Sequence, residues 1–120
     1  MDAERGEVQL AFATRPEFLN RHGTVQGGFL SAMLDSAAAC AVLSQLAEPL
    51  SVVTRSLQVS FLLPAFPGRL EARARVVERH GRDATASASL RDDEARVVAR
   101  CEASLRVVGG ESSASGASSA

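Results

Sequence analysis

The sequence contains no lysine, no tryptophan and no tyrosine, and it has only 5 phenylalanines in 120 residues. Its 13 basic residues are therefore all arginines, and 14 acidic residues bring the formal net charge to −1. Nucleic-acid-binding surfaces depend on a basic excess and often on aromatic rings that stack on bases. We therefore expect no nucleic-acid partner and no attraction to an anionic membrane surface.

Cysteine is also scarce. Cys40 and Cys101 lie far apart, without a CxxC motif and without histidines at a metal-ligand spacing. This pattern predicts two buried free thiols in a reducing compartment, and it predicts neither a metal site nor a cofactor. The acidic, polar N-terminus does not resemble a signal peptide. The apolar run 27–46 is interrupted by Asp35 and by serines, which makes a membrane span costly. These features predict a cytoplasmic protein without a membrane partner.

The length and the 46% of hydrophobic residues predict one domain with a packed core. We assign this single domain to residues 1–108. The last twelve residues, 109–120, read "GGESSASGASSA" and are rich in glycine, serine and alanine. A segment of that composition buries too little apolar surface to fold, so we expect a disordered tail.

The hydrophobic pattern predicts one long helix and an antiparallel sheet. The helix should begin near Val25 to Gly27 and end before Pro49. A weakly alternating first strand is expected at 7–14, followed by a turn or short helix at 15–18. Period-two alternation predicts further strands at 53–64, 68–81, 82–92 and 97–107.

Each of these strands should have one apolar and one polar face. Strict alternation puts Val53 and Leu57 on the apolar face, with Arg55 as an exception, and puts Thr54 and Val98 on the polar face. Many apolar-face residues are alanines, which leaves room for the helix. Because the helix is apolar almost all round, it must be enclosed. The sheet covers only one side, so we expect a second copy of the chain on the other.

A short motif at the start of the helix gives the most specific signal. Asn20 is followed by Gly23, Val25, Gln26 and the glycine pair 27–28, and Asp35 stands eight residues after the first glycine of that pair. This spacing resembles the signature of hot-dog acyl-CoA thioesterases of the phenylacetate-pathway (PaaI-like) branch. The likeness continues through "VVTRSLQVSFLLPAFPG", "ERHGRDATA" and "ARVVARCEASLRV". One departure is Gln26, where many members have histidine.

The resemblance implies an α+β hot-dog fold, with a long central helix wrapped by a five- to six-stranded antiparallel sheet. It also implies hydrolysis of acyl-CoA to free acid and CoA, with no cofactor. Thioester hydrolysis needs an activated water or nucleophile and stabilisation of an oxyanion. The candidate catalytic groups are Asp35 as base or nucleophile, the Gly27 amide as oxyanion donor, and Asn20, Gln26 and Thr54 in supporting roles.

Substrate-binding candidates lie in three places. Gly28 lets the substrate approach the helix start closely, and Pro64 and Phe66 would line the pantetheine path. The turn "RHGR" brings two guanidiniums together, which suits CoA phosphates. Its residues are Arg79, His80, Gly81 and Arg82.

Helix geometry adds a condition. Gly27 and Asp35 are eight residues apart, about 12 Å along the axis at ~1.5 Å per residue. They cannot both reach one carbonyl from the same helix. Two antiparallel helices related by a two-fold axis would bring Gly27 of one chain to Asp35 of the other. We therefore expect a homodimer. Assembly of such dimers to a homotetramer is a further expectation, which the helix geometry itself does not require.

Two other functions stay open. A hot-dog hydratase or dehydratase resembles a different pattern, in which histidine follows the aspartate by five residues; here that position is Cys40. A non-catalytic acyl-CoA-binding module could share every feature named above. The sequence does not identify the acyl group.

Overall fold

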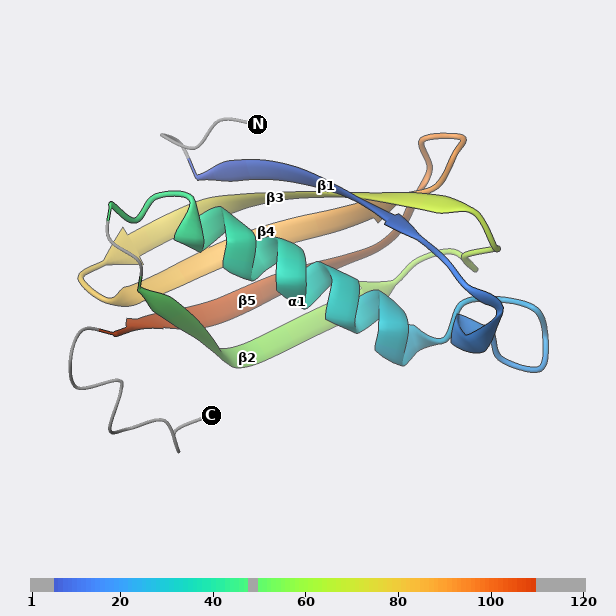
Figure 1. Ribbon diagram of the computed structural model, residues 1–120, viewed down its shortest axis with the longest axis horizontal. Coiled ribbons are helices and arrows are strands. Elements are labelled where there is room, and N and C mark those ends of the chain that lie inside the picture. The colour runs from blue at the N-terminus through green and yellow to red at the C-terminus, as the bar shows by residue number, and fades with distance from the viewer. Residues whose placement is uncertain (1–5, 48–49, 110–120) are drawn as a thin grey trace.

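The computed structural model describes residues 6–47 and 50–109, and the chain forms one helix packed on one sheet (Figure 1). The predicted tail lies outside these residues apart from Gly109. The elements in chain order are β1 (Glu7–Ala13), a 3-10 helix (Pro16–Phe18), α1 (Gly27–Leu43), β2 (Ser51–Phe61), β3 (Arg69–His80), β4 (Asp83–Arg91) and β5 (Val97–Val108).

The five strands form one antiparallel sheet in the order β1-β3-β4-β5-β2. Helix α1 lies along one face of this sheet, with its first turn near the end of β2 and its last turn near the β3–β4 hairpin (Figure 1). This is the hot-dog arrangement that the sequence predicted, with five strands in the described part of the chain. Strands β1 and β2 form the two edges.

The core lies between α1 and the sheet. Leu34, Ala37, Ala38, Ala41 and Val42 of the helix are fully buried. The sheet meets them mostly with small side chains, including buried alanines on each of β3, β4 and β5, so the helix can lie close to it. Larger residues fill the space around these contacts: Leu70, Leu90, Leu105 and Val107.

A β-bulge in β2 changes which side chains face the helix. Thr54 pairs with Leu105, but Ser56 pairs with Ser104, so Arg55 is an extra residue on this strand. Such an insertion reverses the alternation on one side of it. Val52 therefore packs into the core and Thr54 lies on the helix side. The prediction that Val53 shares the face of Leu57 is wrong for this reason.

A second irregularity explains the position of Val98. In the β4–β5 pairing, Leu90 is opposite Ala99 and Arg91 is opposite Val97, which leaves Val98 as the extra residue. Its side chain is fully buried in the core, although alternation predicted the polar face. The positions of Val53 and Val98 differ from the prediction for the same reason. A period-two pattern assumes strict alternation and cannot account for an inserted residue.

The sheet does not enclose the helix. Gly28, Ala32, Ser36 and Leu43 form an exposed stripe on the side of α1 away from the core. In the residues that the structure describes, no helix combines the length and apolarity needed to cross a membrane.

Both cysteines are free. Cys101 is buried under the helix, whereas Cys40 is half-buried, so the prediction of two buried thiols is correct only for Cys101. Burial raises the pKa of the Cys101 thiol to about 11, and the nearby charge of Asp35 adds to the rise. A thiol with such a pKa remains protonated and poorly nucleophilic at neutral pH.

We predict that iodoacetamide at pH 8 does not label Cys101 in the folded protein, because the thiol is both inaccessible and protonated. Peptide mass spectrometry after brief labelling measures this directly. The same reaction in guanidinium chloride should label Cys101 fully, which controls for the reagent. Complete labelling of Cys101 under native conditions would contradict the described core.

We also predict that Leu34→Ala lowers the free energy of unfolding by about 2–5 kcal/mol, because it leaves a cavity between helix and sheet. Urea unfolding followed by circular dichroism measures the loss. Val77→Ala is the matched control, since the Val77 side chain is 52% exposed and should cost little. Equal losses for the two variants would refute this account of the core.

Candidate active site

Asp35 lies in the middle of α1 and is half-buried. The Thr54 hydroxyl of β2 donates a hydrogen bond of 2.6 Å to its Oδ1. Hydrogen bonds to a carboxylate are among the stronger ones in proteins, so this contact orients the Asp35 side chain. The second oxygen, Oδ2, has no hydrogen-bond partner among the described residues. The carboxylate is therefore held at one oxygen and available at the other.

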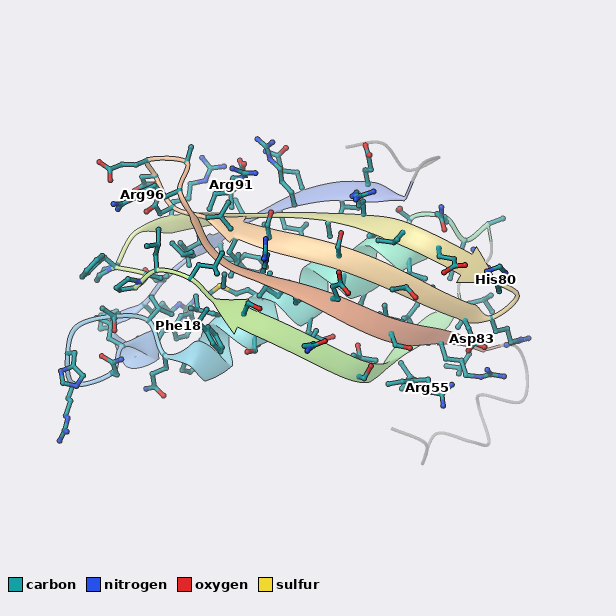
Figure 2. The ribbon with its side chains drawn as sticks, turned by 180° about the vertical axis from the view of Figure 1, so that it is seen from behind. Phe18, Arg55, His80, Asp83, Arg91 and Arg96 are labelled. Atoms are coloured by element: carbon teal, nitrogen blue, oxygen red, sulfur yellow. The ribbon has the colours of Figure 1, made fainter. Side chains whose placement is uncertain are left out.

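The bulge at Arg55 makes this contact possible. Thr54 and Leu57 are three residues apart, so a regular strand would place them on opposite faces. The inserted residue brings both to the helix side. Arg55 itself points to solvent and lies 3.8 Å from Asp83, which also pairs with Arg106 (Figure 2). The bulge thus brings Thr54 from the face that strict alternation predicted to the side of the sheet that carries Asp35.

The start of α1 is not capped by a side chain. The N-cap residue, Gln26, uses its side-chain amide to donate a hydrogen bond of 3.2 Å to the Leu19 carbonyl instead. Its own carbonyl accepts from the amides of Phe29 and Leu30. The amides of Gly27 and Gly28 have no acceptor among the described residues. The first turn thus presents free N–H groups at the positive end of the helix dipole.

Asn20 shapes the loop that precedes the helix. Its Oδ1 accepts from the amides of His22 and Thr24, at 2.8 and 3.2 Å, and its Nδ2 donates to the Thr24 hydroxyl at 2.9 Å. Val25 then joins this loop to the segment after β2 by donating to the Ala65 carbonyl at 2.8 Å. These contacts fix the loop that leads into the helix.

A cavity of about 350 Å³ opens beside the first turn of α1. Its walls are Val25, Gly27 and Leu30 on one side and residues 61–65 on the other, so Pro64 contributes but Phe66 does not. The Phe61 ring lies so close to Gly27 that a Cβ there would be 3.2 Å from it. A Cβ at position 27 would therefore require the exposed Phe61 ring to shift slightly.

Phe61, Leu62 and Leu63 were not predicted from the sequence to be site residues. One feature of the sequence could have indicated them. They are three consecutive apolar residues at the end of a strand whose other residues alternate between apolar and polar. All three side chains are 43–55% exposed in the chain, which is unusual for large apolar residues side by side.

The two halves of the site are far apart in one chain. Gly27 lies by Phe61, at one end of β2, while Asp35 is bonded to Thr54 towards the other end. Gly27 and Asp35 are eight residues apart on the same helix, about 12 Å at ~1.5 Å per residue. A single chain therefore cannot bring both halves to one small group.

The β3–β4 turn contains Arg79, His80, Gly81 and Arg82, all exposed. Arg79 Nε donates to the Gly81 carbonyl at 3.2 Å, and Gly81 has φ +60°, which favours glycine. Arg82 reaches the Val107 carbonyl at 3.3 Å, and the His80 ring contacts Glu78 at 2.6 Å. The turn thus lies at the same end of the sheet as Arg55 and Asp83 (Figure 2), away from Gly27.

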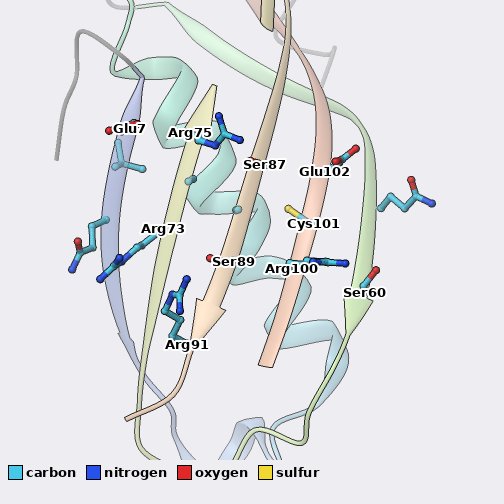
Figure 3. A pocket seen from close by; sticks show the side chains of 15 residues that line it. Glu7, Ser60, Arg73, Arg75, Ser87, Ser89, Arg91, Arg100, Cys101 and Glu102 are labelled. Carbon is cyan, nitrogen blue, oxygen red and sulfur yellow. The ribbon is translucent and has the colours of Figure 1, made fainter. Parts of the chain in front are cut away.

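A larger cavity, about 890 Å³, lies on the outer face of the sheet (Figure 3). Arginines 73, 75, 91 and 100 surround Ser87 and Ser89 there, with Glu7 and Glu102 beside them. Arg73 and Arg100 are the cross-strand neighbours of Ser89. Asp35, Thr54 and Gly27 are not part of this cavity, because the sheet separates it from the helix.

The described residues contain no group of three or more His, Cys, Asp or Glu side chains that could hold a metal ion. The groups described above are one carboxylate, one hydroxyl and the free amides of a helix start. This set suits proton transfer or nucleophilic attack by the carboxylate, together with stabilisation of a developing negative charge.

Solved structures of other proteins share this fold. A phenylacetic acid degradation-related protein from Ralstonia eutropha JMP134 is 36% identical, with a TM-score of 0.84 over 88% of this chain and 80% of that one. The E. coli PaaI protein from the phenylacetic acid degradation operon is 26% identical, with a TM-score of 0.81 over 88% and 75%. The BH2602 protein of Bacillus halodurans, solved with CoA, is 24% identical, with a TM-score of 0.80 over 86% and 68%.

A search of curated proteins found no match. The sequence model of the Thioesterase superfamily matches residues 22–99, which include the helix, the glycine pair, Asp35 and Thr54. This match spans well over half of the chain. The chain therefore belongs to the Thioesterase superfamily.

Proposed function

We propose that this chain hydrolyses acyl-CoA thioesters to the free acid and CoA. The observation that carries the proposal is the half-buried Asp35, oriented by Thr54 at one oxygen and available at the other. Family membership supports a thioester as the bond that is broken. The free Gly27 amide supplies the complementary group, a donor for the oxyanion.

The reaction can follow two routes with this set of groups. As a general base, Asp35 accepts a proton from water while the water oxygen attacks the thioester carbonyl carbon. As a nucleophile, Asp35 attacks that carbon itself, and water then hydrolyses the mixed anhydride. In both routes the carbonyl oxygen becomes an oxyanion bound by the Gly27 amide, the C–S bond breaks, and the CoA thiolate takes up a proton.

The proposed site forms across a homodimer, with Gly27 from one chain and Asp35 from the partner. Two features support this assembly. Strand β2 is an edge of the sheet, with backbone groups open to pairing with a second copy. The exposed stripe of α1 consists mainly of small residues, which would let a second helix approach closely. Pairing of such dimers into a homotetramer also remains a proposal.

We propose that the remaining predicted residues bind the CoA moiety. Arg79, His80, Gly81 and Arg82 would bind its phosphates, because the turn is exposed and carries two guanidiniums. Gly28, Pro64 and Phe66 would border the pantetheine arm near the helix start, with Pro64 at the point where the arm meets the acyl group. The structure of the BH2602 protein, which contains CoA, supports the compatibility of this fold with CoA. Two free cysteines fit a cytoplasmic location, which we retain as part of the proposal.

We predict that Asp35→Asn lowers kcat at least ~100-fold, because asparagine cannot accept the proton or attack the carbonyl. The substitution keeps the size of the side chain and an oxygen that can accept from Thr54. Hydrolysis of CoA esters, followed through release of the free thiol, measures the loss. Asp93→Asn, in the exposed β4–β5 loop, is the matched control. Near-normal turnover by a folded Asp35→Asn protein would reject the catalytic role.

We further predict that two inactive variants restore activity when mixed. Gly27→Pro removes the N–H, yet proline is favoured at the first helical position, and Gln26 has φ −63° and ψ 143°, which proline tolerates before it. Random pairing of Gly27→Pro with Asp35→Asn chains makes half of the dimers mixed, each with one intact site. About a quarter of the wild-type activity should return in a two-fold assembly.

Gly27→Ala controls for the added contact with Phe61, because it keeps the N–H. Subunit exchange by dilution and reconcentration, verified by mass spectrometry of intact dimers, must precede the assay. A mixture that contains mixed dimers but is no more active than its components would exclude the shared site.

A further inference from the structure

The cavity at the start of α1 is lined only by side chains that cannot hydrogen-bond. Val25 and Leu30 come from the helix side, and the segment 61–65 contributes phenylalanine, two leucines, proline and alanine. Backbone atoms supply the polar part of the lining, and the amide of Gly27 is a free donor next to it. A ligand placed here would thus meet apolar side chains throughout and hydrogen-bonding groups only from the backbone.

Backbone hydrogen bonds fix this wall at both ends. The amides of Leu62 and Leu63 both donate to the carbonyl of the bulge residue Val98, at 2.9 and 3.2 Å. At the other end, Val25 donates to the Ala65 carbonyl at 2.8 Å. The exposed apolar side chains therefore stand on a fixed backbone, and the shape of the cavity is largely preformed.

We propose that this cavity binds the acyl group of the substrate and selects neutral, compact, apolar acyl chains. The inference rests on the proposed thioesterase activity and adds the class of substrate. An acyl chain that extends from a carbonyl at the Gly27 amide would enter the apolar space beside Phe61 and Leu63. The volume of about 350 Å³ lies at the small end of the usual range for ligand pockets, which excludes long chains.

The lining also determines what is rejected. A terminal hydroxyl or carboxylate on the acyl chain would lose water and find no side-chain partner in this wall, and burying an unpaired charge is especially costly. Apolar pockets discriminate against an added hydroxyl by about 100-fold. We therefore expect at least ~100-fold lower kcat/KM for an acyl chain that ends in a carboxylate than for its methyl-ended counterpart.

Hexanoyl-CoA and adipoyl-CoA test this, because they have the same number of acyl carbons and differ at the terminal group. Wild-type protein should prefer hexanoyl-CoA by at least ~100-fold in kcat/KM. Leu63→Arg, at a position 43% exposed, would offer a guanidinium to the adipoyl carboxylate. It should raise the adipoyl-to-hexanoyl ratio at least ~10-fold. Val77→Arg, an exposed position outside the cavity, should leave the ratio unchanged.

The outcomes separate this inference from the proposed function. If wild-type protein hydrolyses neither ester nor any other CoA ester, the proposed function fails, and the acyl pocket with it. If it hydrolyses both at similar kcat/KM, or if folded Leu63→Arg leaves the ratio unchanged, the acyl pocket is overturned while the thioesterase activity stands.

Should Leu63→Arg fail to fold, Phe61→Ala provides the second test. Its side chain is 55% exposed, and its removal would lengthen the cavity. The ratio of kcat/KM for decanoyl-CoA to that for hexanoyl-CoA should rise about tenfold, because each buried methylene contributes to discrimination. An unchanged ratio would overturn the assignment.

Discussion

A carboxylate in the middle of an apolar helix must find a hydrogen-bond donor or remain in water, and Asp35 is placed to do both. The donor is Thr54, which faces the helix only because Arg55 is inserted in β2. The same inserted residue points outward to Asp83, so the bulge leaves no polar group in the core. One extra residue in an edge strand thus determines how the helix carboxylate is oriented.

The start of the helix follows a different rule. Most helices satisfy their first amides with a serine, threonine, aspartate or asparagine side chain, which contributes about 1 kcal/mol. Here Gln26 bonds to the preceding loop instead, and Gly27 and Gly28 keep their amides open. The loop is firmly held by Asn20, so the missing cap does not reflect disorder. The chain forgoes stabilisation at the point where the proposed oxyanion would supply it.

The helix, the strands and their antiparallel arrangement could be predicted from the sequence. The spacing of apolar residues along each segment indicates whether it is a helix or a strand and which of its faces is buried. It could not reveal the side-chain directions of Val53 and Val98, because Val98 is itself an inserted residue and the inserted Arg55 interrupts the alternation that relates Val53 to the rest of its strand. The motif around Gly27 and Asp35 was visible as spacing. The wall formed by Phe61 to Leu63 was not, because its position beside Gly27 results from tertiary packing.

The exposed apolar residues of this chain lie beside a proposed active site that one chain cannot complete. Phe61, Leu62 and Leu63 form a group of large apolar side chains that water covers in the single chain. Their burial would favour association, since apolar area removed from water contributes roughly 25 cal/mol per Å². In the proposed dimer these side chains border the cavity that takes the acyl chain. Dimer formation and substrate binding would then bury the same apolar side chains. A substrate that fills the cavity should therefore also stabilise the dimer.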